Sequence, residues 1–322
     1  MFAFLKLIRL QNLLVIAFTQ YMVRWCLVYP ILKTRGFELQ LSNFHFFLLV
    51  LSTVMIAAAG YVINDYFDVR IDKVNKPERL VIGKGVKRRV AMGAHTVINV
   101  IAILISLYVA HAIGAWKLGL IYFICALGLW FYSTTFKRQF LIGNIVIATF
   151  TALVPLVVGI FDLIPCYTTY LIVDYSISFK DIIWYVVAVS FFAFITTLLR
   201  EIIKDIEDYE GDREYGCQTM PIVIGKNSSK IVAIIIASAT MICLGYIQFH
   251  LWKSNDILSY NYFTIALQIP FAFLIFKIAK ASTKKEFRFA GNTAKFIMLM
   301  GICYLFIFAY TLLHFAHAIE RL

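Results

Sequence analysis

Two clusters of acidic side chains contain ten of the 18 Asp and Glu residues in this 322-residue chain. Each cluster follows an apolar segment long enough to cross a membrane. Carboxylates are costly near hydrocarbon, so acids concentrated at two such places indicate a cation between them or a catalytic task. We interpret them as ligands that hold Mg²⁺ against the diphosphate of a lipid substrate. The acids are Asp65, Asp68 and Asp72 in the first cluster, and Glu201, Asp205, Glu207, Asp208, Glu210, Asp212 and Glu214 in the second.

The spacing within each cluster places side chains on one face of a helix. Positions four apart lie one helical turn apart on the same side. Asn64, Asp68 and Asp72 form one such ladder; Asp208 and Asp212 form a second, which two further acids extend. Both helices must then continue beyond the hydrocarbon. Mg²⁺ takes oxygen ligands and substrate phosphates rather than a closed protein cage. The expected metal ligands are Asn64, Asp68, Asp72, Asp205, Asp208 and Asp212, with Asp65 and Glu201 in support.

Basic side chains close to the acids suggest how a diphosphate is held. Cations beside this group stabilise the charge of a leaving diphosphate. For any single base, the excess of positive charge on the cytoplasmic side is the simpler explanation. An Asn within the membrane often serves only to join helices. Ring faces stabilise a prenyl cation, which draws attention to Tyr132. We expect Asp68, Asp208 and Lys137 to be catalytic, Lys76, Arg79, Tyr132 and Lys137 to bind diphosphate, and Arg9 and Asn12 in the first helix to support them.

Composition identifies a polytopic all-α membrane protein. Hydrophobic residues make up 61% and charged residues 15%, whereas soluble proteins carry roughly 25% charged residues. Nine charge-free runs, most near the roughly 20 residues of a membrane helix, predict nine transmembrane helices in one domain over residues 1–322. Barrel strands are shorter and alternate in hydropathy. The runs are Leu10 to Val23 (continuing past Arg24 to Leu32), Leu39 to Asn64, Val90 to Trp116, Leu118 to Phe136, Gln139 to Phe161, Ile182 to Leu199, Ile231 to Trp252, Ile257 to Phe276 and Phe296 to Ile319.

The distribution of Lys and Arg predicts the orientation. With the N-terminus and the first acidic segment on one side, that side collects 23 Lys and Arg residues against six on the other. Because basic loops stay in the cytoplasm, we predict that the N-terminus and both acidic loops, about 65–89 and 201–230, are cytoplasmic and that the C-terminus is outside. Residues 162–181, mostly apolar, are expected at the outer interface. The membrane is expected to be the plasma membrane of a prokaryote.

Three other readings of the composition receive no support. The net charge of +12 follows from topology, so nucleic-acid binding is not expected. The first apolar segment is too long for a signal peptide and has no small-residue cleavage site, so we expect it to be retained. The six cysteines are scattered without a CxxC motif, and no disulfide framework or thiolate metal site follows.

With these features the chain resembles the UbiA-type intramembrane prenyltransferases over nearly its whole length. The first motif of that family, NDxxDxxxD, is matched from Asn64 to Asp72, and the second, DxxxD, by Asp208 and Asp212. The longer strings from Asn64 to Arg79 and from Arg200 to Asp212 look most like those of the digeranylgeranylglyceryl phosphate synthases. The loop at residues 80–83 departs from the family pattern, which bears on the acceptor more than on the metal site.

The resemblance implies a mechanism. Two Mg²⁺ ions bridge the acids and the diphosphate, Arg79 and Lys137 neutralise the leaving group, and the prenyl tail lies in an apolar tunnel. A prenyl group, geranylgeranyl by resemblance, passes from its diphosphate to a prenylglycerol phosphate in membrane ether-lipid synthesis. An aromatic acid of quinone biosynthesis is the alternative acceptor. An ion-coupled transporter is the alternative outside this class, although transporters place such acids at mid-membrane in broken helices.

Overall fold

The computed structural model describes residues 2–75, 77–170 and 178–319, and within these ranges it is helical and without a named strand. Nine helices in the described residues are long and apolar enough to cross a membrane. The predicted all-α fold with nine spans is therefore confirmed. The helices are α1 (Phe2–Leu7), α2 (Leu10–Val23), a π-helical turn (Arg24–Val28), α3 (Tyr29–Thr34), α4 (Asn43–Asn75), α5 (Arg88–Ala112), α6 (Leu120–Thr134), α7 (Ile142–Tyr170), α8 (Lys180–Glu207), α9 (Tyr209–Glu214), α10 (Met220–Ile224), α11 (Lys226–Lys253), α12 (Ile257–Tyr262), a second π-helical turn (Phe263–Gln268), α13 (Ile269–Lys280) and α14 (Lys284–Ile319).

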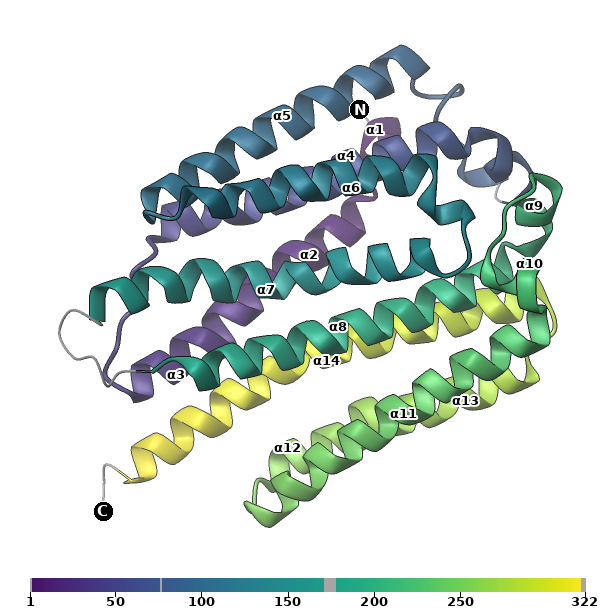
Figure 1. Cartoon of the computed structure of the whole chain (residues 1–322). Coiled ribbons are helices and arrows are strands. Elements are labelled where there is room, and N and C mark those ends of the chain that lie inside the picture. Colours follow the sequence, from purple (N-terminus) through teal and green to yellow (C-terminus); the bar gives the residue numbers. More distant parts are fainter. Residues whose placement is uncertain (1, 76, 171–177, 320–322) are drawn as a thin grey trace.

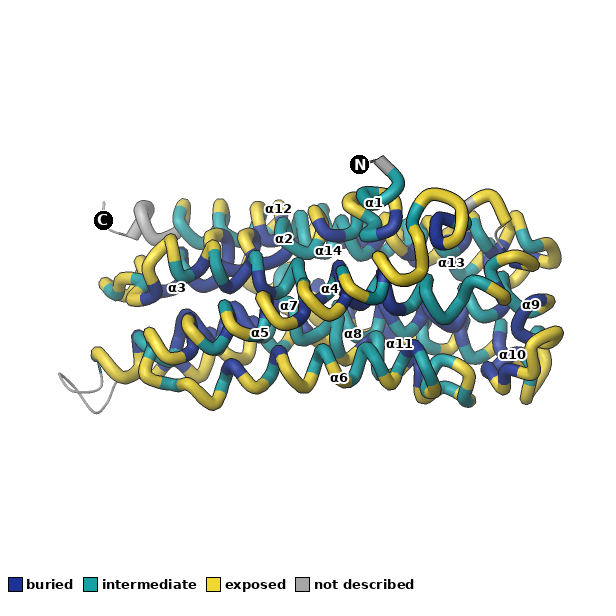
Figure 2. Tube along the Cα trace, turned by 90° about the horizontal axis from the view of Figure 1, so that it is seen from above, coloured by how far each residue is buried: buried dark blue, intermediate teal, exposed yellow. Residues whose placement is uncertain are grey.

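The long helices lie side by side in one elongated bundle, with α3 at one end and α9 and α10 at the other (Figures 1 and 2). Helix α8 packs against both α7 and α14, and α11 pairs with α13. One large apolar core is formed by the first span, α4, α5, α6, α7, the start of α8 and part of α14. A second core is formed by the end of α8 with α11, α13 and α14. Helices α8 and α14 contribute to both cores and pack against each other, so together they fix one half of the bundle against the other.

Several helices are longer than their apolar runs. Helix α4 continues to Asn75, although the apolar run ends at Asn64, and α8 continues to Glu207, although its run ends at Leu199. Residues 65–75 and 201–207, predicted as parts of acidic loops, are therefore helical. The ladder of Asn64, Asp68 and Asp72 requires α4 to continue as a helix beyond the hydrocarbon, and it does so.

The predicted outer segment also changes. Helix α7 continues to Tyr170 with Pro155 and Pro165 inside it. The first part of the segment predicted at 162–181 is therefore helical, and residues 171–177 of it lie outside the described residues. Helix α14 begins at Lys284, twelve residues before the run that predicted it. In each case the apolar run marks the part suited to hydrocarbon rather than the end of the helix.

The second predicted ladder is wrong in one respect. Helix α8 ends at Glu207, and Asp208 is a cap with φ −91° and ψ 7°, so Asp208 and Asp212 do not continue one straight face from Asp205. Asp212 N still donates to Asp208 O at 3.1 Å, which preserves a single turn before α9. The break places Gly211 against Asn75 at the end of α4.

An ion pair is buried where the first span meets α7. Arg24 Nη1 lies 2.8 Å from Asp162 Oδ1, and both side chains are almost fully buried. Arg24 Nη2 donates to Leu41 O at 2.6 Å, which adds the segment before α4. Because Asp162 lies some twenty residues along α7 from its start, this pair lies near the end of the bundle opposite the acids. A buried charge is retained only when paired and hydrogen-bonded, so the pair fixes how these three segments meet.

Candidate functional site

The two acidic motifs meet at one end of the bundle, here called the acidic end, where α4 contacts α9. Asn75 Nδ2 donates to Asp208 O at 3.1 Å, and Gly211 N donates to Asn75 Oδ1 at 3.1 Å. A Cβ on Gly211 would lie 2.4 Å from Asn75 Nδ2, so only glycine allows this approach. Lys284 Nζ donates to Asn75 O at 2.8 Å and brings in the start of α14. One asparagine therefore holds the two motifs together.

Lys137 lies against the first motif. Its ammonium forms an ion pair with Asp68 and lies 3.5 Å from Asn64 Oδ1. The turn that carries Lys137 passes so close to Gly143 that a Cβ there would lie 2.6 Å from Lys137 Cα. The neighbouring Arg138 O accepts from Gln218 N at 2.7 Å, which ties this turn to the segment after the second motif. The structure thus brings together the three residues predicted around the first motif.

The acids of the second motif are oriented by neutral partners. Asn144 Nδ2 donates to Asp205 Oδ2 at 2.8 Å, and Thr219 Oγ1 donates to Asp212 Oδ2 at 3.2 Å. Burial, together with the charge of Asp208, raises the pKa of Asp212 to about 6. Asp212 also lies within electrostatic range of Asp68 on α4. The second motif therefore brings a carboxylate within electrostatic range of the first.

The donor set fits a hard cation that is bound together with a substrate. No group of three His, Cys, Asp or Glu side chains in the described residues forms a preformed metal cage. Mg²⁺ is commonly held by one or two carboxylates, water and substrate phosphates, so a cage is not required. Burial raises the pKa of the nearby Cys217 to about 11, so its thiol stays protonated and is a poor ligand. The side chains of the two motifs therefore offer oxygen ligands, which are the ligands that Mg²⁺ prefers.

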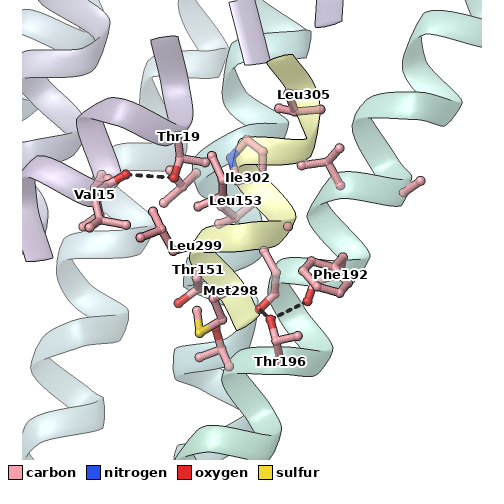
Figure 3. Close-up of a pocket in the computed structure, with 18 of the residues that line it drawn as sticks. Val15, Thr19, Thr151, Leu153, Phe192, Thr196, Met298, Leu299, Ile302 and Leu305 are labelled. Carbon is pink, nitrogen blue, oxygen red and sulfur yellow. Dashed lines mark hydrogen bonds between the residues drawn. The ribbon is translucent and has the colours of Figure 1, made fainter. Parts of the chain in front are cut away.

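A cavity of about 1590 Å³ begins at the acidic end and runs through the bundle. Helix α8 lines it from Asp181 to Lys204, about 35 Å at 1.5 Å per residue, comparable to the thickness of a bilayer core. Figure 3 shows side chains of α2, α7, α8 and α14 around this space, with Met298, Leu299 and Ile302 on α14. The walls are mainly apolar, and the space is long enough to hold an isoprenoid chain.

The predicted residues fall into three groups around this cavity. Arg9, Asn12, Asn64, Tyr132 and Glu201 line it. A second group lies beyond the lining residues, toward the acidic end. Asp68 and Asp72 follow Asn64 by one and two turns of α4, Lys137 pairs with Asp68, and Asp205, Asp208 and Asp212 follow Lys204 at the end of α8, its cap and α9. The third group consists of two residues whose side chains the structure does not describe. Lys76 lies outside the described residues, and the side chain of Arg79 is likewise not described.

The supporting residues have specific contacts. Arg9 Nη2 donates to Asp65 Oδ1 at 2.7 Å, and its guanidinium lies 4.9 Å from the centre of the Tyr61 ring. Asp65 therefore orients Arg9 at the start of α2. Glu201 is buried between Arg200 and Lys204 and pairs with both. Glu201 and both of its basic partners line the cavity.

Sequence reasoning missed three cations of the cavity. Arg200, Lys204 and Lys295 line it, although their charges had been explained by membrane topology. Arg200 and Lys204 are four residues apart, a spacing that places both on one face of α8 and could have drawn attention to them. Lys295 carries no comparable signal, because it comes from α14, about ninety residues further along the chain.

Fold and site together define a polytopic membrane protein with an acidic, oxygen-rich site at the mouth of a membrane-long apolar cavity. The model of the UbiA prenyltransferase family matches residues 35–300. The chain therefore belongs to the UbiA prenyltransferase family.

Individual relatives narrow the comparison. The chain is 34% identical over 189 residues to digeranylgeranylglyceryl phosphate synthase of Pyrococcus horikoshii, an alignment that spans 58% of each chain. The enzyme of the same name from Sulfolobus acidocaldarius is 31% identical over 238 residues, which is 73% of this chain and 74% of that one. The chain thus aligns with less than two thirds of the Pyrococcus protein and about three quarters of the Sulfolobus protein.

Solved structures share the fold. One that concerns digeranylgeranylglyceryl phosphate synthase in membranes superposes with a TM-score of 0.59 at 25% identity, covering 95% of this chain and 97% of that one. A UbiA homolog from Archaeoglobus fulgidus, solved with GPP and Mg²⁺, gives a TM-score of 0.51 at 17% identity, covering 94% and 99%. At that identity the second structure shows the fold alone.

Proposed function

We propose that this protein is a Mg²⁺-dependent prenyltransferase that transfers a geranylgeranyl group from its diphosphate to the hydroxyl of a prenylglycerol phosphate. The observation that carries the proposal is the meeting of two acidic motifs and Lys137 at the mouth of a membrane-long apolar cavity. The relatives named digeranylgeranylglyceryl phosphate synthase support this acceptor. The Archaeoglobus homolog, which holds GPP and Mg²⁺, supports this class of donor and metal.

The residues at the acidic end have distinct proposed roles. Asn64, Asp68 and Asp72 on α4, with Asp205, Asp208 and Asp212 from the second motif, would hold two Mg²⁺ ions. When bound, Mg²⁺ neutralises the charge that the diphosphate gains as it leaves. Asn75 keeps the two ligand sets at a fixed separation. Asn144 and Thr219 orient two of the carboxylates.

The remaining side chains act on the substrate. Lys137 lies at the first ligand set, so its ammonium can reach a phosphate oxygen of a diphosphate bound there. Arg79 and Lys76 are proposed to add positive charge beside it. The apolar cavity holds the prenyl tail and excludes water from the allylic carbon. Tyr132 and Asn64 line the cavity where its polar end begins, which is where the carbon–oxygen bond would break.

The cellular setting follows from the same proposal. The protein is an integral membrane protein, and we propose that its acidic end faces the cytoplasm of a prokaryote, because 23 of its Lys and Arg residues fall on that side. A soluble diphosphate donor head group then reaches the site from the cytoplasm. The whole chain would act as one transmembrane domain. An aromatic acid remains the alternative acceptor.

A transfer assay tests the proposal. Purified protein is incubated with labelled geranylgeranyl diphosphate and Mg²⁺, together with either geranylgeranylglycerol phosphate or 4-hydroxybenzoate. We expect a labelled diether product with the first acceptor, and none when EDTA replaces Mg²⁺. Product with the aromatic acid alone would make the acceptor assignment wrong. Absence of transfer to either acceptor would contradict the proposed activity.

Substitutions test the assigned site in the same assay. Asp68→Asn and Asp208→Asn keep side-chain size but remove a charged oxygen ligand, so we expect a loss of at least about 100-fold in rate. Glu214→Gln is the matched control, because Glu214 lies in the same acidic cluster but is exposed. All three variants should elute as the wild type does from a sizing column. Wild-type turnover in either Asp variant would contradict the metal assignment.

A further inference from the structure

Four cations line the cavity at its acidic end and form a surface that we call the cation wall. They are Arg9, Arg200, Lys204 and Lys295. Arg200 and Lys204 lie one turn apart on α8, and Lys295 reaches the same place from α14. Lys295 lies within electrostatic range of each of the other three. Segments far apart in the sequence thus bring four positive charges to one part of the cavity.

The cation wall carries more positive charge than its own acids neutralise. Glu201 pairs with Arg200 and Lys204, and Asp65 pairs with Arg9. Two carboxylates against four cations leave a surplus of two positive charges within the wall. The further acids beside Lys204, Asp205 and Asp208, belong to the proposed metal ligands. Lys295 makes no hydrogen bond or ion pair with a described residue, although it is exposed toward the cavity. Cations gathered beside hydrocarbon are costly, which indicates that an anion joins them in function.

This surface adjoins the acidic ligands at Lys204, which precedes Asp205 and lies within electrostatic range of Asp208, and its other members lie further into the cavity. Asp68 and Lys137 belong to α4 and to the turn before α7, beyond the end of the cavity. The cation wall belongs to the start of α2, to α8 and to α14, and it faces the cavity itself. A donor diphosphate on the acids would therefore leave Arg200 and Lys295 available to a second anion.

We propose that the cation wall binds the phosphate group of the acceptor lipid, so that the acceptor hydroxyl lies beside the donor's allylic carbon. This inference rests on the proposed function and deepens it. A phosphomonoester carries about −1.5 to −2 charges, which matches the surplus. Arg200 can hold two phosphate oxygens at once with its guanidinium. The carboxylate of an aromatic acid, with one charge and no apolar tail, would match this surface poorly.

The apolar part of the cavity agrees with this assignment. Its volume of about 1590 Å³ exceeds the roughly 300–1000 Å³ of an ordinary small-molecule site. After Lys295, the next residues along α14 that line the cavity are Phe296, Met298 and Leu299. An acceptor with its phosphate at Lys295 would lay its tail along this helix. Donor and acceptor chains would then share one apolar space.

Binding without the donor tests the inference independently of transfer. The affinity of the detergent-solubilised protein for geranylgeranylglycerol phosphate is compared with its affinity for geranylgeranylglycerol. We expect the wild type to prefer the phosphorylated lipid. Lys295→Gln should reduce affinity for the phosphorylated lipid by about 10- to 100-fold, the range for a hydrogen bond to a charged group. It should not change binding of the unphosphorylated lipid. Lys285→Gln, an exposed position on the same helix outside the cavity, is the matched control.

The alternative source of the anion is the donor. If the cation wall binds diphosphate instead, Lys295→Gln raises the KM for geranylgeranyl diphosphate and leaves binding of the acceptor unchanged, which overturns the inference. Equal affinity of the wild type for the two lipids also overturns it. A phosphate preference that Lys295→Gln removes supports the site even if no transfer is observed, and failure of transfer alone counts only against the proposed function. Arg200→Gln provides a second variant with the same expectation.

Discussion

Replacing Gly211 by alanine should separate the two acidic motifs. The new Cβ would lie 2.4 Å from Asn75 Nδ2 and 2.6 Å from Asn75 Oδ1, so the Asn75 side chain must move. Two hydrogen bonds of 3.1 Å are then lost, each contributing about 1 kcal/mol, and the buried N–H of Gly211 loses its acceptor at about 1–3 kcal/mol. The higher helix propensity of alanine returns at most about 1 kcal/mol. We expect a net loss of about 2–4 kcal/mol in the contact between the motifs.

The Mg²⁺ dependence of the transfer rate measures this loss. If half of it, about 1.4 kcal/mol, falls on the metal site, the Mg²⁺ concentration for half-maximal rate rises about tenfold. Asn75→Ala removes the same two bonds, and the double variant should be no worse than either single one, because the two residues share one interaction. Gly93→Ala is the control, since nothing lies within 4 Å of a Cβ there. An unchanged Mg²⁺ requirement in Gly211→Ala would refute the reasoning.

Two further expectations concern stability and pH. Arg24→Leu or Asp162→Leu alone should destabilise the protein by about 3–5 kcal/mol, because each leaves an unpaired buried charge, whereas the double variant should recover most of that loss. Thermal unfolding in detergent would decide this, and a double variant no better than the single ones would contradict it. The Mg²⁺ concentration for half-maximal rate should rise as pH falls through about 6, because the Asp212 carboxyl is protonated below its raised pKa and ionised above it. A Mg²⁺ requirement that is constant between pH 5 and 7 would contradict this role for Asp212.

The number of helices and the acidic residues could be predicted from the sequence because both depend on local signals. Charge-free runs of membrane length follow from the absence of water in the bilayer core. The four-residue spacing of Asn64 and Asp68 is likewise a property of one helix. The apolar runs predict ends for α4 and α8 that lie before the observed ends. Hydropathy marks the edge of the hydrocarbon, and a helix can continue beyond that edge into water.

The rest of the site depends on contacts between distant segments. The chain turns at Asp208, where α9 brings Gly211 against Asn75, 136 residues away, and no local pattern encodes that meeting. Lys137 reaches Asp68 across 69 residues, so its contact could be expected only from a family motif. Lys295 joins Arg200 and Lys204 through the packing of α14 against α8. A positively charged surface of this kind is visible only after the fold is known.

The central claim is that one metal–diphosphate site lies between α4 and the turn from α8 to α9. Its most direct test is an experimental structure with Mn²⁺ and a non-hydrolysable geranylgeranyl diphosphate analogue, in which anomalous scattering locates the metal. We expect metal bound by Asp68 from α4 and by Asp208 or Asp212 from the second motif, with the prenyl tail in the cavity beside α14. Metal and diphosphate bound elsewhere, for example at the opposite end beside Asp181 and Asp256, would contradict the claim.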